Sequence, residues 1–395
     1  MNKFIYLPLL FVMLACQSFP SKRGPGSTPN TELDLDPKFE EFEGGSFENE
    51  KAINDELIKS AKEMMLNVQR TNPSGVVTRD AHAKTHGCLK AEFQVHNEAL
   101  SAQHRVGIFA ENKSYDAWVR FSNNDQLPIR KDNEFDLRGM SIKVMNVQGK
   151  KIMEGLEQAP TQDFLMYGSN VFFIKDNKDY IGFIKGLRDG NAATVLLTQQ
   201  TEAAIHTFYA QWKVSGFTNP ANMPYHSAVP VRLGLLEDEN RTAMKYRAIP
   251  CDQKHPYPSP NSKSDTNYFR ENLKSTLSQQ RICYNFQVQL QTDPKVMPIE
   301  DSRVAWPEQA SILSPRGFSP YVTVAEITIP QQNFDTPLRD QYCEGLSLSP
   351  WHALVEHKPL GRTMRMRRDL YKATSEFRRK INGTLAPEPW QFDIE

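Results

Sequence analysis

The sequence has no excess of charge of either sign, since 47 lysines and arginines balance 47 aspartates and glutamates. A balanced chain has no electrostatic preference for a polyanion, so we expect no nucleic-acid partner. It also lacks a Gly-x-Gly-x-x-Gly segment, so no nicotinamide-binding signature is recognisable. With 39% hydrophobic residues among 395, the chain can still bury a sizeable core.

Long apolar stretches are scarce, and the most apolar one, residues 4–15, is too short to span a bilayer as a helix. It follows Lys3, and a basic tip before a short apolar run is typical of an export signal. Residues 14–17 resemble a bacterial lipobox, in which Cys16 would be acylated; ordinary signal cleavage nearby is the alternative. We favour residues 1–16 as a lipoprotein signal peptide. The protein is then exported and lipid-anchored in the bacterial cell envelope, on the periplasmic side of the outer membrane.

The segment after the signal has no hydrophobic periodicity. Residues 18 to about 45 are rich in serine, proline, glycine and acidic residues, so we expect residues 17–50 to form a flexible tether. Residues 51–395 then form one folded domain. Apolar residues at helical spacing predict an amphipathic helix at about 52–70 that packs on this domain. They are Ile53, Leu57, Ile58, Ala61, Met64, Met65 and Val68.

Cysteine is rare, with five residues in the chain. Export into an oxidising compartment allows a disulfide among Cys88, Cys251, Cys283 and Cys343. A bond between Cys251 and Cys283 would staple the proline-rich loop 254–267, and it is the pairing that we favour. Four free, buried thiols are an equally consistent alternative.

Eight segments have alternating or β-rich character, which permits closure into a barrel. They lie near 89–96, 117–123, 137–147, 164–174, 228–235, 243–250, 281–291 and 320–330. Helices are expected at about 177–189, 194–215, 265–280 and 361–381. The expected fold class is therefore α+β, an eight-stranded antiparallel β-barrel with surrounding helices.

Arg367 and Tyr371 lie four residues apart in the last of these helices, so their side chains share one face. The phenol of a free tyrosine has a pKa near ~10 and binds ferric iron poorly unless a fixed cation stabilises its anion. Arginine suits this role because it stays charged even when it is buried. The pair therefore predicts a tyrosinate that can bind a metal.

This pair and further segments, all in the expected order along most of the chain, resemble motifs of the catalase superfamily. The segments are Val76-Val77-Thr78-Arg79-Asp80-Ala81-His82, Trp118-Val119-Arg120-Phe121-Ser122, Asp136-Leu137-Arg138-Gly139, Val171-Phe172-Phe173-Ile174-Lys175-Asp176 and Lys358-Pro359-Leu360-Gly361. The resemblance implies a catalase-like fold that binds haem b. Tyr371 would be its proximal iron ligand, and tyrosine is the axial ligand of catalases.

The resemblance also places the other site residues. His82 falls at the family's distal histidine, and Ser122 at the serine that orients its ring. The other cofactor-binding residues that it implies are Arg79 and Arg120 at the haem propionates, Tyr180 over the porphyrin, and Arg367 beside Tyr371. Each also has an ordinary structural interpretation, such as a surface salt bridge for the arginines or helix packing for Tyr180.

One position departs from the family's pattern. Counting back from Val171, the distal asparagine of true catalases is replaced by Tyr167. A bulkier phenol should hinder the oxidation of a second peroxide, so we expect peroxidase-type turnover to exceed dismutation.

We therefore expect a haem-dependent, peroxide-consuming oxidoreductase, with His82 as the acid/base group. Its substrate would be a peroxide or organic hydroperoxide with an unknown reductant, and a homo-oligomer is compatible with the sequence. A fatty-acid hydroperoxide isomerase similar to catalase-like allene oxide synthases is an alternative, although that branch has threonine where this chain has Ala81. A haem-binding lipoprotein without turnover is a third possibility. Asp80, His82 and His86 could also suggest a metal site, but no further ligand follows at a characteristic spacing.

Overall fold

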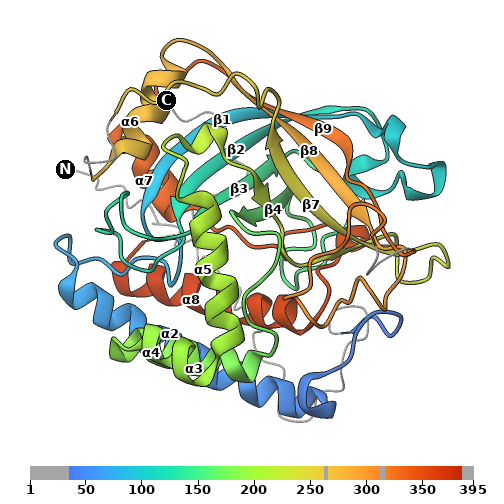
Figure 1. Cartoon of the computed structure of the whole chain (residues 1–395), viewed down its shortest axis with the longest axis horizontal. Coiled ribbons are helices and arrows are strands. Elements are labelled where there is room, and N and C mark those ends of the chain that lie inside the picture. The colour runs from blue at the N-terminus through green and yellow to red at the C-terminus, as the bar shows by residue number, and fades with distance from the viewer. Residues whose placement is uncertain (1–34, 262–265, 312–315, 385–395) are drawn as a thin grey trace, which may run out of the picture.

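A closed barrel of antiparallel strands forms the centre of the molecule (Figure 1). The computed structural model describes residues 35–261, 266–311 and 316–384. Hydrogen bonds run from β1 through β2, β3, β4, β5, β7, β8 and β9 back to β1. These eight strands close the ring, and β6 pairs along β7. The strands are β1 Thr85–Val95, β2 Ser114–Asn123, β3 Arg138–Met145, β4 Thr161–Tyr167, β5 Tyr225–His226, β6 Val231–Leu233, β7 Thr242–Pro250, β8 Ile282–Leu290 and β9 Val322–Ile329.

The barrel interior is filled by aromatic and aliphatic side chains, because every second residue of a strand points inward. Phe286 on β8 is central to this core: its ring centroid lies 4.8 Å from that of Phe164, 5.2 Å from Phe93 and 5.6 Å from Tyr246. All four residues are buried. The alternate residues of the same strands face outward, where helices cover part of the barrel.

Seven α-helices surround the barrel in the described residues. They are α2 Phe47–Thr71, α3 Asn177–Asp189, α4 Ala192–Gln199, α5 Thr201–Val214, α6 Tyr268–Leu277, α7 Pro337–Gly345 and α8 Arg362–Asn382. Short 3₁₀ helices span Glu43–Gly45, Asn97–Ala99, Ala102–His104, Gly107–Phe109, Pro220–Asn222 and Val355–His357. The predicted α+β fold with an eight-stranded antiparallel barrel is confirmed.

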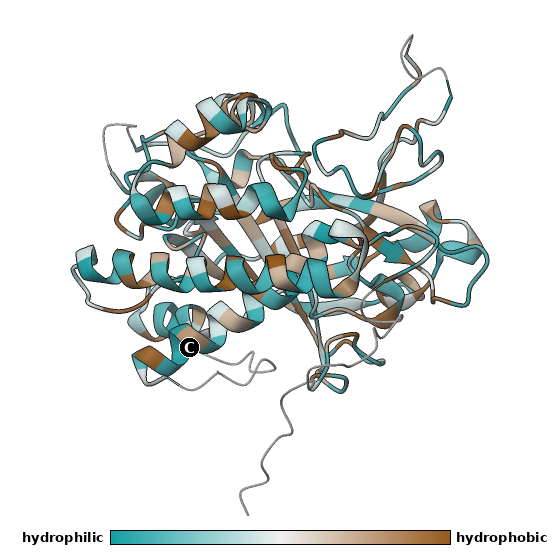
Figure 2. Ribbon diagram, turned by 90° about the horizontal axis from the view of Figure 1, so that it is seen from below, coloured by the Kyte–Doolittle hydropathy of each residue, from teal (hydrophilic) through white to brown (hydrophobic). Residues whose placement is uncertain are grey.

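Helices α2, α3 and α8 pack together beneath the barrel (Figures 1 and 2). Each contributes one apolar stripe to a shared buried cluster, as amphipathic helices do. The members are Leu57, Ala61, Ile181, Ile184, Met366 and Leu370. This packing fixes α8, the helix that carries Arg367 and Tyr371, against α2 and α3.

The prediction of a flexible tether at residues 17–50 is wrong for residues 35–50, the part that the structure describes. These residues pack on the domain. Asp36 is fully buried and lies 3.2 Å from the guanidinium groups of both Arg232 and Arg241. Glu40 is also buried, and it pairs with Lys358 and Arg365. Acidic composition indicated a solvated segment, but these carboxylates are paired with buried cations far along the chain. The signal peptide and Cys16 lie outside the described residues.

Two element boundaries also differ from expectation. The fourth strand ends at Tyr167 rather than near 174, because the hydroxyl groups of Tyr167 and Ser169 both donate to the carbonyl of Val171 and turn the chain. The helical stretch 194–215 is divided at Gln200 into α4 and α5. Helix α7 and the two-residue strand β5 were not predicted, since both are too short to show a clear period.

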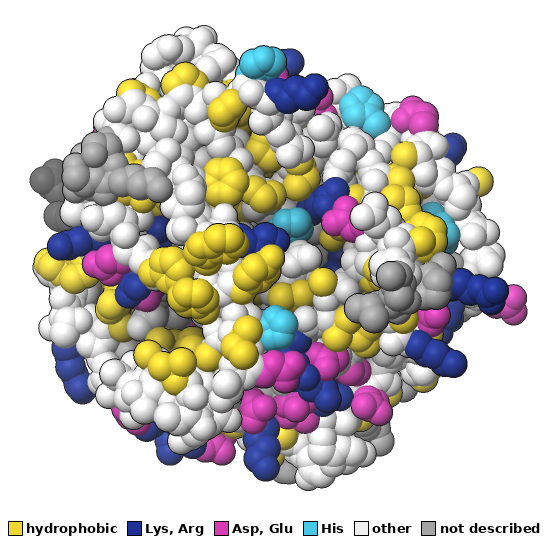
Figure 3. Space-filling model, viewed as in Figure 1, with side chains coloured by type: hydrophobic (Ala, Val, Ile, Leu, Met, Phe, Trp, Pro, Cys, Tyr) yellow, Lys and Arg dark blue, Asp and Glu magenta, His cyan; other side chains and the backbone are white. Residues whose placement is uncertain are grey.

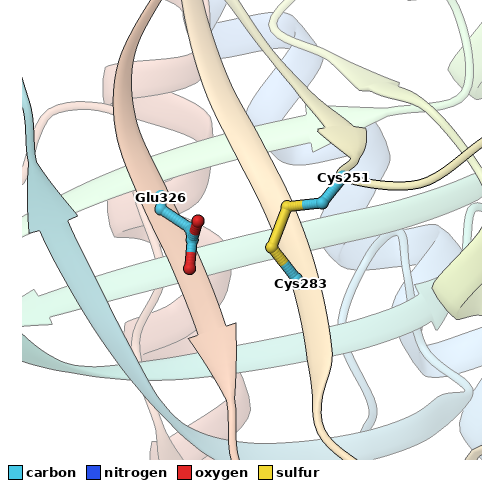
Figure 4. A group of neighbouring side chains, drawn as sticks. All are labelled: Cys251, Cys283 and Glu326. Atoms are coloured by element: carbon cyan, nitrogen blue, oxygen red, sulfur yellow. A yellow bond between two sulfur atoms is a disulfide. The ribbon is translucent and has the colours of Figure 1, made fainter.

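Two disulfides join the four cysteines in the described part of the chain. The favoured Cys251–Cys283 bond is confirmed, with its Cα atoms 5.5 Å apart, and Glu326 on β9 lies beside it (Figure 4). Cys88 on β1 is also bonded to Cys343 on α7, with a Cα separation of 6.1 Å. That pairing was missed because its partners lie 255 residues apart in the chain.

Helix α5 presents an apolar face to solvent. Ile205, Phe208 and Trp212 are 63%, 64% and 60% exposed. Figure 3 shows hydrophobic side chains gathered over this helix. No helix within the described ranges combines the length and apolar character needed to cross a bilayer.

Candidate functional site

A partly open cavity of about 70 Å³ lies between α8 and the outer face of the barrel. Arg120, Ser141 and Leu165 form part of its wall, and they are direct cross-strand neighbours on β2, β3 and β4. They face outward because adjacent residues on each strand fill the barrel core. The rest of the lining comes from segment 79–82, segment 346–348 and α8, as Arg79, Asp80, Ala81, His82, Leu346, Ser347, Leu348, Tyr371, Thr374, Ser375 and Arg378.

The predicted pair on α8 is formed. Arg367 donates to the phenolic oxygen of Tyr371 from Nε at 3.1 Å and from Nη2 at 2.9 Å. Burial alone would lower the pKa of Arg367, but the phenolic oxygen of Tyr371 outweighs it and the pKa is raised. Arg367 is therefore a fixed cation. Tyr371 is the only tyrosine among the described residues that line the cavity.

His82 faces the same cavity from a strained backbone position, with φ of 58° in the left-handed region. Its backbone N–H donates to the carbonyl of Asn124, and its ring Nδ1 lies 2.8 Å from the carbonyl of Asn123. A carbonyl only accepts hydrogen bonds, so Nδ1 carries the proton and Nε2 keeps a free lone pair. Burial, with the nearby charge of Arg120, lowers the pKa of His82 to about 3. The ring is therefore a neutral base at physiological pH.

Ser122 also contacts the His82 ring, as the sequence predicted, at 3.2 Å from Nδ1. The shorter contact to the Asn123 carbonyl was not predicted, because a backbone acceptor leaves no signal in sequence. Gly139 lies under the ring, where a Cβ atom would come within 2.6 Å of His82 Nδ1 and 2.9 Å of Ser122 Oγ. This close approach explains the glycine that ends the Asp-Leu-Arg-Gly segment.

Tyr167 lies near His82 but does not line the cavity. Tyr167 on β4 is the direct cross-strand neighbour of Gly139 on β3, the glycine that lies under the His82 ring. Its hydroxyl donates to the Val171 carbonyl, so that proton is not available to a ligand. Burial raises the pKa of Tyr167, which keeps it a neutral phenol.

Tyr180 is likewise absent from the lining. Its ring packs with Phe172, Phe173 and Phe183, with centroids 5.8, 6.1 and 5.9 Å away. Burial raises its pKa, and the nearby oxygen of Tyr371 adds to that rise. Tyr180 therefore belongs to an aromatic cluster next to Tyr371, as the helix-packing alternative predicted.

Three arginines converge at the rim of the cavity. Arg79 and Arg120 were predicted, whereas Arg378 was missed. It lies seven residues after Tyr371, close to two helical turns, and so on the same face of α8. Burial is the main reason that the pKa of Arg120 and the pKa of Arg378 are lowered, and the nearby charge of Arg79 lowers both further. The pKa of Arg378 falls to about 9. Such a cluster of desolvated cations favours an anionic partner.

The residues present fit a haem. Tyr371 with Arg367 offers an oxygen ligand, and His82 offers a base on the same cavity. Nε of Arg120 is buried and has no hydrogen-bond partner among the described residues, as expected of a donor set for a carboxylate. Asp80, His82 and His86 do not form a metal-binding group in the described part of the chain.

Comparisons with known proteins agree with this fold. No protein-family model and no curated protein matches the sequence. Among solved structures, a fungal catalase superimposes with a TM-score of 0.64 at 16% identity over 80% of this chain. A bacterial catalase gives 0.60 at 17% over 81%, and catalase A from Saccharomyces cerevisiae gives 0.60 at 16% over 80%.

The chain matches only 61%, 61% and 65% of the lengths of these three catalases. At such low identity the likeness concerns architecture alone. It nevertheless agrees with the ordered motifs of the sequence and with the closed barrel. The chain therefore has a catalase-like fold.

Proposed function

We propose that this protein is a haem-dependent enzyme that consumes peroxides, acting as a peroxidase with an external reductant. The carrying observation is that one cavity holds both the Arg367–Tyr371 pair and a neutral His82 with a free Nε2. When bound, haem supplies a redox-active iron, and an anionic oxygen ligand favours its ferric and higher oxidation states. This chemistry suits peroxide cleavage better than oxygen carriage.

In this proposal the cofactor is haem b. Tyr371 binds its iron, and Arg367 stabilises the phenolate through two N–H donors. Arg79, Arg120 and Arg378 bind the propionates, for which planar guanidinium groups are well suited. Tyr180 supports the ligand side through the aromatic cluster rather than through the cavity wall.

Cleavage of an O–O bond requires a proton to move from one peroxide oxygen to the departing one. Nε2 of His82 takes that proton and returns it, while Nδ1 stays bonded to the Asn123 carbonyl and Ser122. The bond to the carbonyl holds the ring in the tautomer that the step needs. Gly139 leaves room for the ring at this position.

Peroxide kinetics with the haem-loaded protein test this proposal. His82→Ala should lower the rate of peroxide consumption by about 10²–10⁴-fold, the usual loss of a general acid–base group. His255→Ala is the matched control, because that imidazole is 84% exposed and pairs with Asp252. No consumption by the loaded wild type would refute the proposal, and an allene oxide formed from linoleate hydroperoxide would favour the isomerase.

The proposal includes export and acylation at Cys16, which rests on the lipobox-like residues 14–17. An anchored enzyme would meet hydroperoxides of membrane lipids at high local concentration. Labelling of the wild type but not of Cys16→Ser with a radioactive fatty acid would support this location. Equal recovery of both variants in the soluble fraction would refute it.

A further inference from the structure

Glu344, on α7, occupies the arginine cluster of the cavity. Its carboxylate pairs with Arg79 and lies 3.7 Å from Arg378. Burial alone would raise the pKa of Glu344, but the charges of Arg79, Arg120 and Arg378 lower it. Glu344 is thus an ionised carboxylate at the position where the proposed function requires the carboxylates of haem.

The backbone around Glu344 binds the same arginines. Nη2 of Arg79 donates to the carbonyls of Cys343 at 2.7 Å and Leu346 at 3.0 Å, and Arg378 donates to the carbonyl of Glu344. Residues 346–348 then continue as part of the cavity wall. We call residues 343–348 the strap, because this segment covers the arginines and borders the cavity.

The strap is held in place covalently. Cys343 is bonded to Cys88, and Cys88 is the direct cross-strand neighbour of Arg120 on β1 and β2. Glu344 therefore directly follows Cys343, whose disulfide partner Cys88 lies beside Arg120. A tethered carboxylate acts at a high effective concentration, which an incoming carboxylate of a free ligand must overcome.

We propose that Glu344 competes with the haem carboxylates for Arg79 and Arg378, and that the Cys88–Cys343 bond strengthens this competition by holding the strap over the cluster. The inference rests on the proposed function. Haem binding then requires that a haem carboxylate replaces the carboxylate of Glu344 and that the strap is displaced. A carboxylate then offsets part of the charge of the arginine cluster both before and after haem binds.

The test is titration of the full-length apoprotein with ferric haem, followed by absorption. Glu344→Gln should bind haem about tenfold more tightly than the wild type, because the competing charge-assisted hydrogen bonds are weakened. Glu344→Asp keeps the charge on a shorter side chain and should show a smaller gain. Asp340→Asn is the matched control, since Asp340 lies on the same helix but pairs with Arg270.

A second readout is thermal unfolding. Apo Glu344→Gln should unfold at a lower temperature than the apo wild type, and haem should raise its Tm by more. Replacement of Cys88 and Cys343 by alanine should also tighten haem binding, whereas replacement of Cys251 and Cys283 should not. If Glu344→Gln does not fold, Glu344→Asp and the cysteine pairs decide.

The outcomes separate the two proposals. Haem uptake by all variants with equal affinity would overturn the competition by Glu344 and leave the proposed function standing. Failure of the wild type and of Asp340→Asn to bind haem would overturn the proposed function, and this inference with it. Tighter binding by Glu344→Gln and by the Cys88/Cys343 variant alone would establish both the competition and its covalent support.

Discussion

Two N–H groups of Arg367 converge on the phenolic oxygen of Tyr371, at 3.1 and 2.9 Å, across one turn of α8. A single hydrogen bond could arise from chance packing, but this two-donor arrangement directs positive charge at one oxygen. It makes Tyr371 the oxygen of the cavity best suited to bind ferric iron.

Arg367→Gln should weaken haem binding and shift the ferric absorption spectrum away from that of a tyrosinate complex. Hydrogen bonds to charged groups contribute about 1.5–3 kcal/mol, so the Kd for haem should rise about tenfold to a hundredfold. Arg368→Gln, which removes the neighbouring cation that pairs with Asp369, should leave the spectrum unchanged. Identical titrations for the two variants would contradict the role of Arg367.

Gly139→Ala should displace the His82 ring, because the new Cβ would lie 2.6 Å from Nδ1. Overpacking of this kind costs about 1–3 kcal/mol of stability, and peroxide turnover should fall further than stability does. Gly216→Ala is the control, since no atom lies within 4 Å of the added Cβ. Full peroxidase activity in Gly139→Ala would show that the ring position does not matter.

Two substitutions at Tyr167 separate the effects of its hydroxyl and of its bulk. Tyr167→Phe should leave turnover almost unchanged, because the hydroxyl is bonded to the Val171 carbonyl. Tyr167→Asn should raise oxygen evolution relative to peroxidase turnover, since it restores the residue of true catalases and removes the bulk. An oxygen electrode measures the ratio, and no rise in Tyr167→Asn would refute our explanation.

Stability should fall as the pH is lowered below neutrality. Burial lowers the pKa of His82 to about 3 and that of His357 to about 4, whereas an unfolded histidine titrates near ~6.5. Between these pH values the unfolded chain binds more protons than the folded chain. Each buried histidine therefore lowers the free energy of unfolding by about 1.4 kcal/mol for each pH unit of acidification. Urea unfolding at pH 7 and pH 5 measures this loss.

His357→Gln isolates one of these contributions. Nε2 of His357 accepts from the backbone N–H of Ile108 at 3.0 Å, and a glutamine oxygen can replace that acceptor without titrating. The variant should therefore lose less stability than the wild type between pH 7 and pH 5. An unchanged pH dependence would mean that His357 does not titrate as its burial implies.

Short-range patterns accounted for much of the fold and of the site. Strand alternation located seven of the eight barrel strands, all except β5, and the spacing of Arg367 and Tyr371 gave their contact. Arg378 could have been predicted in the same way, because it lies seven residues after Tyr371, and a spacing close to two helical turns places both side chains on one face.

Features that depend on long-range contacts were not accessible in this way. The Cys88–Cys343 bond and the buried pairing of Asp36 join positions far apart in the chain. Glu344 lies on a short helix without a family motif, and only the folded chain places it among the arginines. The hydroxyl of Tyr167 could not be oriented either, because its acceptor is a backbone carbonyl.

The most direct test of the account is the absorption spectrum of the purified protein supplied with haem, beside that of its Tyr371→Phe variant. We expect stoichiometric uptake by the wild type, with a high-spin ferric spectrum of the tyrosinate type that the variant lacks. Haem uptake with the same spectrum in both proteins would contradict Tyr371 as the iron ligand. No uptake by the wild type would contradict the haem enzyme altogether.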